Sequence, residues 1–455
     1  MIRHVVLLFA LLALTACKDE GPNAATQTSA NGVPFTLITL PEHEYVSIQI
    51  AWGSDWAYRA ETNKAAAIVG THLILAGGAT GYPAGAVAER LADIDSDGVI
   101  YDSVNDHIIG ELTFTPENMD ETIQIANAHL RAPNLDTVWF DRIKDEIAQN
   151  IAEAQARPDN AGFDAMRWAV FGDQPLRNAL SFDDPETFAR LTIDDVAAWH
   201  QEIFTQFPTA VVIAGDIDAD AAGAALDALL FGLPATQRPL HREATPDFTP
   251  RRILLHVPDA EVTTLAFIAP ISPTNQGGEI EDMILVQALG GDDDQSVLFN
   301  AVRTDLRASY GFGADIANYT RAHRILFMTG QVETEKLAQV ESTVRTAYAT
   351  FLRDGLQGSL DERKKPLETY FAEMPEYVVD QAQSELQSAL DDYPPGRSLD
   401  LVTELQAVTA ESLMARLATA FPAPDALSLI AISPDADALA GACVITSPRE
   451  AVDCP

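Results

Sequence analysis

The sequence has 455 residues and a hydrophobic content of 47%, which is enough to bury the cores of folded domains and excludes a largely disordered chain. Its 67 acidic and 29 basic residues give a formal net charge of −38. A surface of this sign repels nucleic acids and anionic lipid headgroups, which argues against nucleic-acid binding. Adaptation to salty surroundings explains this charge more simply than a charged substrate does.

The chain begins with a segment typical of exported proteins. A positively charged start, Met1 to His4, precedes the apolar run Val5 to Ala16, which is too short to span a bilayer. This pattern predicts a secretory signal peptide over residues 1–16. The tetrapeptide Leu14-Thr15-Ala16-Cys17 at its end resembles a bacterial lipobox, which implies that Cys17 is lipidated.

The expected location is therefore the bacterial cell envelope, with the chain anchored by lipid and facing the periplasm. No later segment approaches the ~18 uninterrupted apolar residues of a spanning helix, so the lipid is the only predicted membrane attachment. Lys18, directly after the lipidated cysteine, resembles an outer-membrane sorting signal.

Residues 17–30 are polar and lack periodicity, so they are predicted to form a flexible tether. Beyond them, Val46, Ile48, Ile50 and Trp52 alternate with smaller or polar residues, which predicts a half-buried strand. Further along the chain, a second strand is predicted at Glu111 to Pro116 and a long amphipathic helix at Thr137 to Gln155.

The second part of the chain shows the same kinds of element. Ser309 to Tyr319 and Arg324 to Val332 are predicted to form a β-hairpin. Helices are expected at about Glu335 to Asp354 and Glu376 to Asp392.

An internal repeat organises these elements. The segment that begins at Thr192 aligns without a gap with the segment that begins at Thr409, an offset of 217, and the same offset relates strand pairs near the start of each half. The predicted fold is α+β, with two tandem homologous domains, each a mostly antiparallel sheet with helices packed on one face. The predicted boundaries are 31–232 for the N-terminal domain, 233–250 for a linker, 251–437 for the C-terminal domain and 438–455 for a tail.

The tail contains Cys443 and Cys454. An oxidising, exported location favours a disulfide between them, while two free thiols remain the alternative. Neither cysteine has a histidine nearby in the sequence, which argues against cysteine catalysis.

The stretch Gly70 to Gly78, GTHLILAGG, begins like a zinc site but lacks the remaining ligands. A helix offers two metal ligands when they are four residues apart, and no two of the nine histidines have that spacing. A lone histidine such as His72, beside Leu73 and Ile74, is more often a satisfied core or boundary residue than a metal ligand.

The duplicated halves, the opening NGVPFTLITLPE, the segment GSDWAYRAE and the stretch GTHLILAGG together resemble the insulinase/pitrilysin metallopeptidases. In that family one helix carries His-x-x-Glu-His and a later helix carries a third ligand, a glutamate. The resemblance places the first histidine on His72, the general base on Leu75, the second histidine on Ala76 and the third ligand on Asn150. Three of these four positions cannot perform the family's chemistry, so no metal is expected in this chain.

A second signature of the family is intact. Ser296, Leu298, Phe299, Arg303 and Tyr310 match its Ser-x-Leu-Phe-x-x-x-Arg run and the tyrosine that follows. The resemblance implies that Arg303 and Tyr310 hold the substrate backbone and the tetrahedral intermediate, since a guanidinium and a phenol both donate hydrogen bonds to an oxyanion.

The resemblance therefore implies the non-metal subunit of a heteromeric insulinase-like zinc endopeptidase, inactive alone. A homologous partner would carry the zinc, and peptide substrates would bind along a strand edge. The alternative is a catalytically inactive scaffold or peptide-binding lipoprotein of the same fold. A weaker alternative is a single-chain zinc peptidase with an unusual ligand set around His72.

Overall fold

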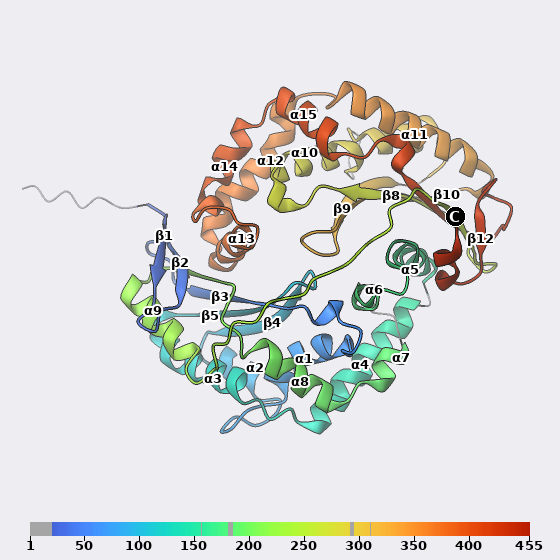
Figure 1. The fold of residues 1–455 in the computed structure, drawn as a ribbon. Helices are drawn as coiled ribbons and strands as arrows, with labels where there is room; N and C mark the ends of the chain where they lie inside the picture. The colour runs from blue at the N-terminus through green and yellow to red at the C-terminus, as the bar shows by residue number, and fades with distance from the viewer. Residues whose placement is uncertain (1–20, 156, 181–184, 292–294, 310) are drawn as a thin grey trace, which may run out of the picture.

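The computed structural model describes residues 21–155, 157–180, 185–291, 295–309 and 311–455. It consists of two halves, each built on a six-stranded, mostly antiparallel sheet. Figure 1 shows the N-terminal half, from blue to green, below the C-terminal half, with most helices on the outside. The predicted α+β class with two homologous domains is confirmed.

The N-terminal sheet has the strand order β1-β2-β6-β3-β5-β4, and β2 and β6 pair in parallel while the other neighbours are antiparallel. Its strands are β1 (Asn23–Thr28), β2 (Pro34–Thr39), β3 (Val46–Gly53), β4 (Asp97–Ser103), β5 (His107–Phe114) and β6 (Ala210–Gly215). The helices of this half are α1 (Ala65–Ala76), α2 (Val87–Ala92), α3 (Met119–Arg131), α4 (Thr137–Gln155), α5 (Pro158–Phe171), α6 (Pro175–Leu180), α7 (Pro185–Arg190), α8 (Ile193–Ile203) and α9 (Ala219–Leu229).

The C-terminal sheet has the order β12-β7-β11-β8-β10-β9. Its strands are β7 (Arg252–His256), β8 (Thr263–Ile271), β9 (Phe312–Asn318), β10 (Arg324–Val332), β11 (Ser428–Ser433) and β12 (Cys443–Ile445). The helices are α10 (Glu279–Gly290), the π-helical η4 (Phe299–Asp305), α11 (Leu337–Asp354), α12 (Leu360–Glu373), α13 (Val378–Leu390), α14 (Arg397–Ala407) and α15 (Ala410–Ala420).

The two halves repeat one another in local detail. Thr192 caps α8 and Thr409 caps α15, and each threonine accepts the backbone N–H of the residue three positions later in a reciprocal capping box. Each helix then leads to a buried central strand, β6 or β11. The repeat offset of 217 therefore relates equivalent structural positions.

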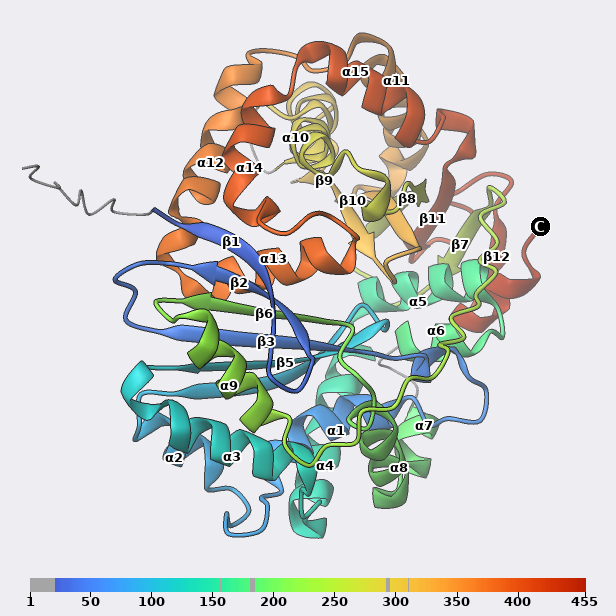
Figure 2. The same cartoon turned by 60° about the vertical axis from the view of Figure 1, so that its left-hand side comes forward.

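The prediction placed helices on one face of each sheet. In the structure the second face is also covered, because each half contributes one helix that packs on the sheet of the other half. In α5, Ala165 and Phe171 are buried with Ile430 and Ile432 of β11. In α13, Ala382 and its buried neighbours pack against the sheet that contains β6 and β3. Figure 2 shows α5 and α13 between the two sheets. This exchange joins the halves through apolar cores.

The exchange corrects the prediction of a half-buried strand at Val46–Gly53. All eight residues of β3 are buried, and the side chains of Ser47 and Gln49, on the more polar face, are 0% exposed. Gln49 donates its amide N–H to the Val379 carbonyl oxygen of α13 at 3.3 Å. The strand pattern contained no sign that a helix more than 300 residues away covers its second face.

Two predicted irregular segments form edge strands. Within the predicted tether 17–30, Asn23–Thr28 is the strand β1, which pairs with β2. Its alternating Ala, Thr and Gln residues are too polar and too weakly buried to produce an amphipathic signal. In the tail 438–455, Cys443–Ile445 forms β12 and pairs with β7.

The predicted linker, residues 233–250, has no helix or strand and runs along the N-terminal half. Arg238 and Arg242 of this segment bind Asp55 and the Ser54 carbonyl oxygen, so polar contacts fix its path. Within the described residues, none of the helices combines the length and apolarity that a bilayer crossing needs.

Candidate functional site

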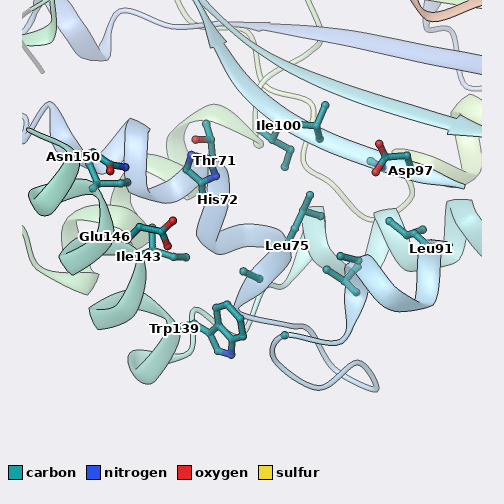
Figure 3. Close-up of a pocket in the computed structure, with 17 residues that line it drawn as sticks. Thr71, His72, Leu75, Leu91, Asp97, Ile100, Trp139, Ile143, Glu146 and Asn150 are labelled. Atoms are coloured by element: carbon teal, nitrogen blue, oxygen red, sulfur yellow. The ribbon is translucent and has the colours of Figure 1, made fainter. Parts of the chain in front are cut away.

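The four positions expected to form a vacated metal site surround one cavity. His72, Leu75 and Ala76 lie on α1, where spacings of three and four residues share a helix face, and Asn150 lies on α4. All four line a cavity of about 500 Å³ between α1, α2, β4 and α4 (Figure 3). The structure therefore brings these four positions together.

Packing of α1 turns His72 toward this cavity. A Cβ atom on Gly70 would lie 2.4 Å from the Trp199 ring of α8, so only glycine permits this close approach. Leu73 and Ile74 are fully buried in the N-terminal core. His72, between these contacts, is exposed and lines the cavity, so it is not the core or boundary residue that its neighbours suggested.

The wall of the cavity is largely apolar. Gly85 allows the Trp139 ring to approach, because a Cβ at Gly85 would lie 2.4 Å from that ring. The apolar lining residues are Leu75, Ala76, Val87, Ala88, Leu91, Val99, Ile100, Trp139, Ile143 and Ile147. Such a lining favours an apolar occupant over a hydrated ion.

The residues of the cavity do not fit zinc. A catalytic zinc needs three nitrogen, sulfur or carboxylate ligands, and Leu75 and Ala76 offer no donor atom. Asn150 supplies only an amide in place of the family's carboxylate. In the part of the chain that the structure describes, no group of three or more histidine, cysteine, aspartate or glutamate side chains could hold a metal ion.

Two carboxylates stand on opposite sides of the cavity. Glu146 lies on α4, one turn before Asn150, and Asp97 is the first residue of β4 (Figure 3). Both side chains are exposed, and neither forms an ion pair with a lysine or arginine of the described residues. Asp97 accepts the neighbouring Gly98 N–H at 2.8 Å.

Strand β4 places an open sheet edge beside the cavity. It is the last strand of the N-terminal sheet and pairs along one side with β5. Val99 of β4 lines the cavity and is 43% exposed. An edge strand of this kind leaves main-chain N–H and C=O groups available to a further strand.

Arg303 lies in the C-terminal half and does not line the cavity. Buried Leu298 and Val302 anchor η4, while the exposed Arg303 guanidinium lies 4.9 Å from the Phe299 ring centroid. The Ser296 hydroxyl accepts the backbone N–H of Phe299 at 3.3 Å near the start of this turn. Tyr310, the expected partner of Arg303, lies outside the described residues.

Sequence reasoning missed β4, and with it Asp97 and the sheet edge. The internal repeat carried the necessary signal. Subtracting the offset of 217 from the predicted hairpin Ser309–Val332 gives residues 92–115, which contain both β4 and β5. The predicted strand at Glu111 to Pro116 covered only the end of β5.

Cys443 and Cys454 are joined by a disulfide, with their Cα atoms 5.7 Å apart. Cys454 is buried in the cluster formed by α5 and the C-terminal sheet, so the bond ties the end of the chain to that core. Cys17, the expected lipidation site, lies outside the described residues.

Comparison with protein families gives one match. Residues 190–365 match the family described as "Peptidase M16 inactive domain". No curated protein is similar enough in sequence to count as a relative.

Several solved structures share the fold. A peptidase M16 inactive domain from Pseudomonas fluorescens has a TM-score of 0.79 at 16% identity, covering 91% of this chain and 98% of its own. A protease from Helicobacter pylori has a TM-score of 0.71 at 13% identity, covering 91% and 100%. The first half of the periplasmic protease PqqL from Escherichia coli has a TM-score of 0.65 at 16% identity, covering 94% and 96%. Against the complete PqqL chain, the match covers 50% of PqqL.

Proposed function

We propose that this chain, an insulinase-like relative of the M16 peptidases, is the non-metal subunit of a heteromeric zinc endopeptidase. The observation that carries the proposal is the cavity in which Leu75, Ala76 and Asn150 occupy the positions of catalytic groups. A chain with these residues is expected to have no peptidase activity by itself.

The partner subunit in this proposal is a homologous chain with an intact His-x-x-Glu-His helix, and it supplies the zinc and the general base. This chain contributes substrate-binding residues from its C-terminal half. Arg303 donates hydrogen bonds to the substrate backbone and the developing oxyanion in the partner's site, and Tyr310 assists it. The exposed position of Arg303 on η4 is consistent with contact to another chain.

The similarity to PqqL supports a paired arrangement. This chain is similar in fold to the first half of PqqL and covers 50% of the whole PqqL chain, so one protease contains more than one unit of this length. Two separate chains of this length would form an assembly of comparable size.

A periplasm-facing position, with Cys17 lipidated, is part of the same proposal. The apolar run before Cys17 supports export, and the bond between Cys443 and Cys454 is of a kind that persists in oxidising compartments. Lys18 supports sorting to the outer membrane.

The test is to purify the chain alone and together with a co-expressed homologue that carries His-x-x-Glu-His, and to measure cleavage of a quenched fluorescent peptide. We expect activity only from the pair, and a loss of at least about 100-fold in kcat for Arg303→Ala, as for other oxyanion donors. Arg307→Ala, an exposed arginine just beyond η4, is the matched control and should keep full activity. Cleavage by the lone chain, or an unchanged rate for Arg303→Ala, would contradict the proposal.

The second candidate is a peptide-binding scaffold without proteolytic function, which the apolar cavity beside an open strand edge favours. It predicts a stable complex that cleaves no peptide and does not respond to changes at Arg303.

Metal analysis of the purified chain separates both candidates from a single-chain zinc peptidase, which requires stoichiometric zinc. The neighbouring gene is also informative, since an adjacent homologue with the complete motif favours the subunit.

A further inference from the structure

We propose that the disulfide between Cys443 and Cys454 is a redox-sensitive lock on one of the two joints between the halves. While the bond is intact, the C-terminal tail holds α5 on the C-terminal sheet. Reduction by a protein dithiol releases the tail and loosens α5, while α13 keeps the halves attached. This lock acts on the joint between the halves whether or not the chain serves a peptidase.

The C-terminal tail packs against α5, the helix that the N-terminal half places on the C-terminal sheet. After β12, the short helix η8 (Pro448–Asp453) contacts α5, which lies beside the dark red end of the chain in Figure 1. Ala451 and Cys454 are buried in the same apolar cluster as Trp168 and Phe171 of α5. The burial of α5 therefore depends on the tail as well as on the sheet.

Contacts at the C-terminal end of α5 add to this packing. The Arg449 guanidinium carbon lies 5.3 Å from the Trp168 ring centroid, and Arg449 Nη2 lies 4.0 Å from Asp173 Oδ1 just beyond the helix. Val452 lies close to Gly172, since a Cβ on Gly172 would be 3.5 Å from the Val452 Cγ2. Arg449 and Asp173 are 74% and 78% exposed, so this ion pair alone holds the tail only weakly.

The tail has few other attachments that could replace the disulfide. Strand β12 is three residues long and pairs with β7 at the end of the sheet. Of the six residues of η8, only Ala451 is buried. Ordering so short a segment costs conformational entropy that few buried groups offset, whereas the disulfide restricts the undocked chain and so favours the docked one. Reduction therefore shifts the tail towards release.

The two sulfurs differ in access, which sets the order of the reaction. Cys443 is half-buried, whereas Cys454 is 3% exposed. A thiolate of the reductant attacks the Cys443 Sγ, the disulfide breaks, and Cys454 leaves as a thiolate that takes up a proton. The second thiol of the reductant then displaces Cys443, which is protonated in turn. The protein gains two thiols, and the dithiol is oxidised to a disulfide.

The second joint is made by residues of a different apolar cluster. Ala382 and Leu386 of α13 are both 0% exposed and pack with Ile38 and Val212 of the N-terminal sheet. The tail and α5 share another cluster, on the C-terminal sheet. Release of the tail therefore loosens the joint at α5 and leaves the joint at α13 in place, so the halves stay connected and can pivot.

The test is hydrogen–deuterium exchange, read by mass spectrometry, on the mature chain with Cys17→Ser, in which Cys443 and Cys454 are the only cysteines. Dithiothreitol serves as the dithiol, and alkylation of two thiols verifies complete reduction. We expect amide exchange in α5 to accelerate by about 10-fold or more, with α13 and α8 unchanged. Reoxidation should restore the slow exchange.

Variants separate the bond from the packing of the tail. The double substitution Cys443→Ser and Cys454→Ser should reproduce the fast exchange of α5 and make it insensitive to dithiothreitol. Ala451→Asp keeps the disulfide but places a carboxylate at a buried position, so it should accelerate α5 exchange in the oxidised chain. Asp453→Ala, an exposed position on the same helix, is the matched control and should have no effect.

Unchanged exchange in α5 after complete reduction would overturn the lock, because the tail would then stay docked without the bond. An equal acceleration in α5, α13 and α8 would overturn it as well, because the disulfide would then stabilise the whole fold and not one joint.

Discussion

Arg238 of the linker binds Asp55 through two nitrogen–oxygen contacts, 3.0 and 2.7 Å long, and the Asp55 side chain is only 1% exposed. The His241 backbone N–H also donates to this carboxylate at 3.0 Å. The linker is therefore part of the folded N-terminal half.

The first prediction concerns Arg238→Ala. Removing this guanidinium leaves the buried Asp55 carboxylate with Arg59 as its remaining positive neighbour. The Arg59 Nε lies 3.7 Å away, so it balances the negative charge less well. We expect the free energy of unfolding to fall by about 2–3 kcal/mol, measured by urea denaturation. Arg190→Ala is the control, because its side chain is 68% exposed and pairs with Glu186 of the same helix, so the substitution should cost about 0.5 kcal/mol or less. Equal effects of the two substitutions would show that the linker contact is dispensable.

The second prediction concerns Asp282, which is 1% exposed and lies in the C-terminal core. Its carboxylate accepts two bonds from Arg416, both 2.7 Å, and one from Arg324 at 3.0 Å. Asp282→Ala leaves two guanidiniums in a poorly solvated place, so we expect a loss of about 3–5 kcal/mol by urea denaturation. Substitution of Asp354, an exposed carboxylate that pairs with the adjacent Arg353, should have little effect. A small loss for Asp282→Ala would indicate that water reaches the arginines.

The third prediction concerns pH. Burial, together with the positive charges of Arg242 and Arg321, lowers the pKa of His107 to about 2. The unfolded chain binds a proton at this imidazole below about pH 6.5 and the folded chain does not. The contribution of His107 to stability is therefore complete above about pH 6.5 and decreases by up to ~1.4 kcal/mol per pH unit below it.

Unfolding midpoints measured between about pH 7.5 and 5.5 check this sign. The midpoint should fall with decreasing pH in the native chain, and His107→Gln should fall less steeply. Burial also lowers the pKa values of His129, His200 and His323, so part of the slope should remain in the variant. Identical slopes in the two proteins would show that His107 is protonated in the folded state.

The fourth prediction is that the cavity can be converted into a metal site. In a chain with Leu75→Glu, Ala76→His and Asn150→Glu, His72 gains a second imidazole on the same face of α1 and a carboxylate across the cavity. We expect stoichiometric zinc after dialysis, measured by elemental analysis. The native chain and Ala76→His alone should retain none, because each lacks the third ligand. A folded triple variant without zinc would show that these positions are not arranged as ligands.

The internal repeat made most of the fold predictable. The segments that begin at Thr192 and Thr409 contain the same order of cap, amphipathic helix and buried strand, and both form it. The edge strands were harder to predict from the sequence. Strands β1 and β12 bury little surface, so their sequences do not need an apolar face. Burial of Ser47 and Gln49 could not be read from β3, since the covering helix belongs to the other half.

The candidate site was predictable in part. Helix spacing and the family resemblance located His72, Leu75, Ala76 and Asn150, which the structure places around one cavity. The sequence did not show that the cavity is open, apolar and adjacent to a sheet edge. Those properties depend on how α1, α2, β4 and α4 meet in space.

The exchange of α5 and α13 has a consequence for the chain as a whole. Each helix is covalently attached to one half and buried on the sheet of the other. A separated half would therefore expose one face of its sheet and the apolar side of its own exchanged helix. The halves should therefore aggregate when expressed separately and become soluble when co-expressed. The same contacts would allow two identical half-length chains to form a domain-swapped dimer, the arrangement from which fusion of a duplicated gene would yield this protein.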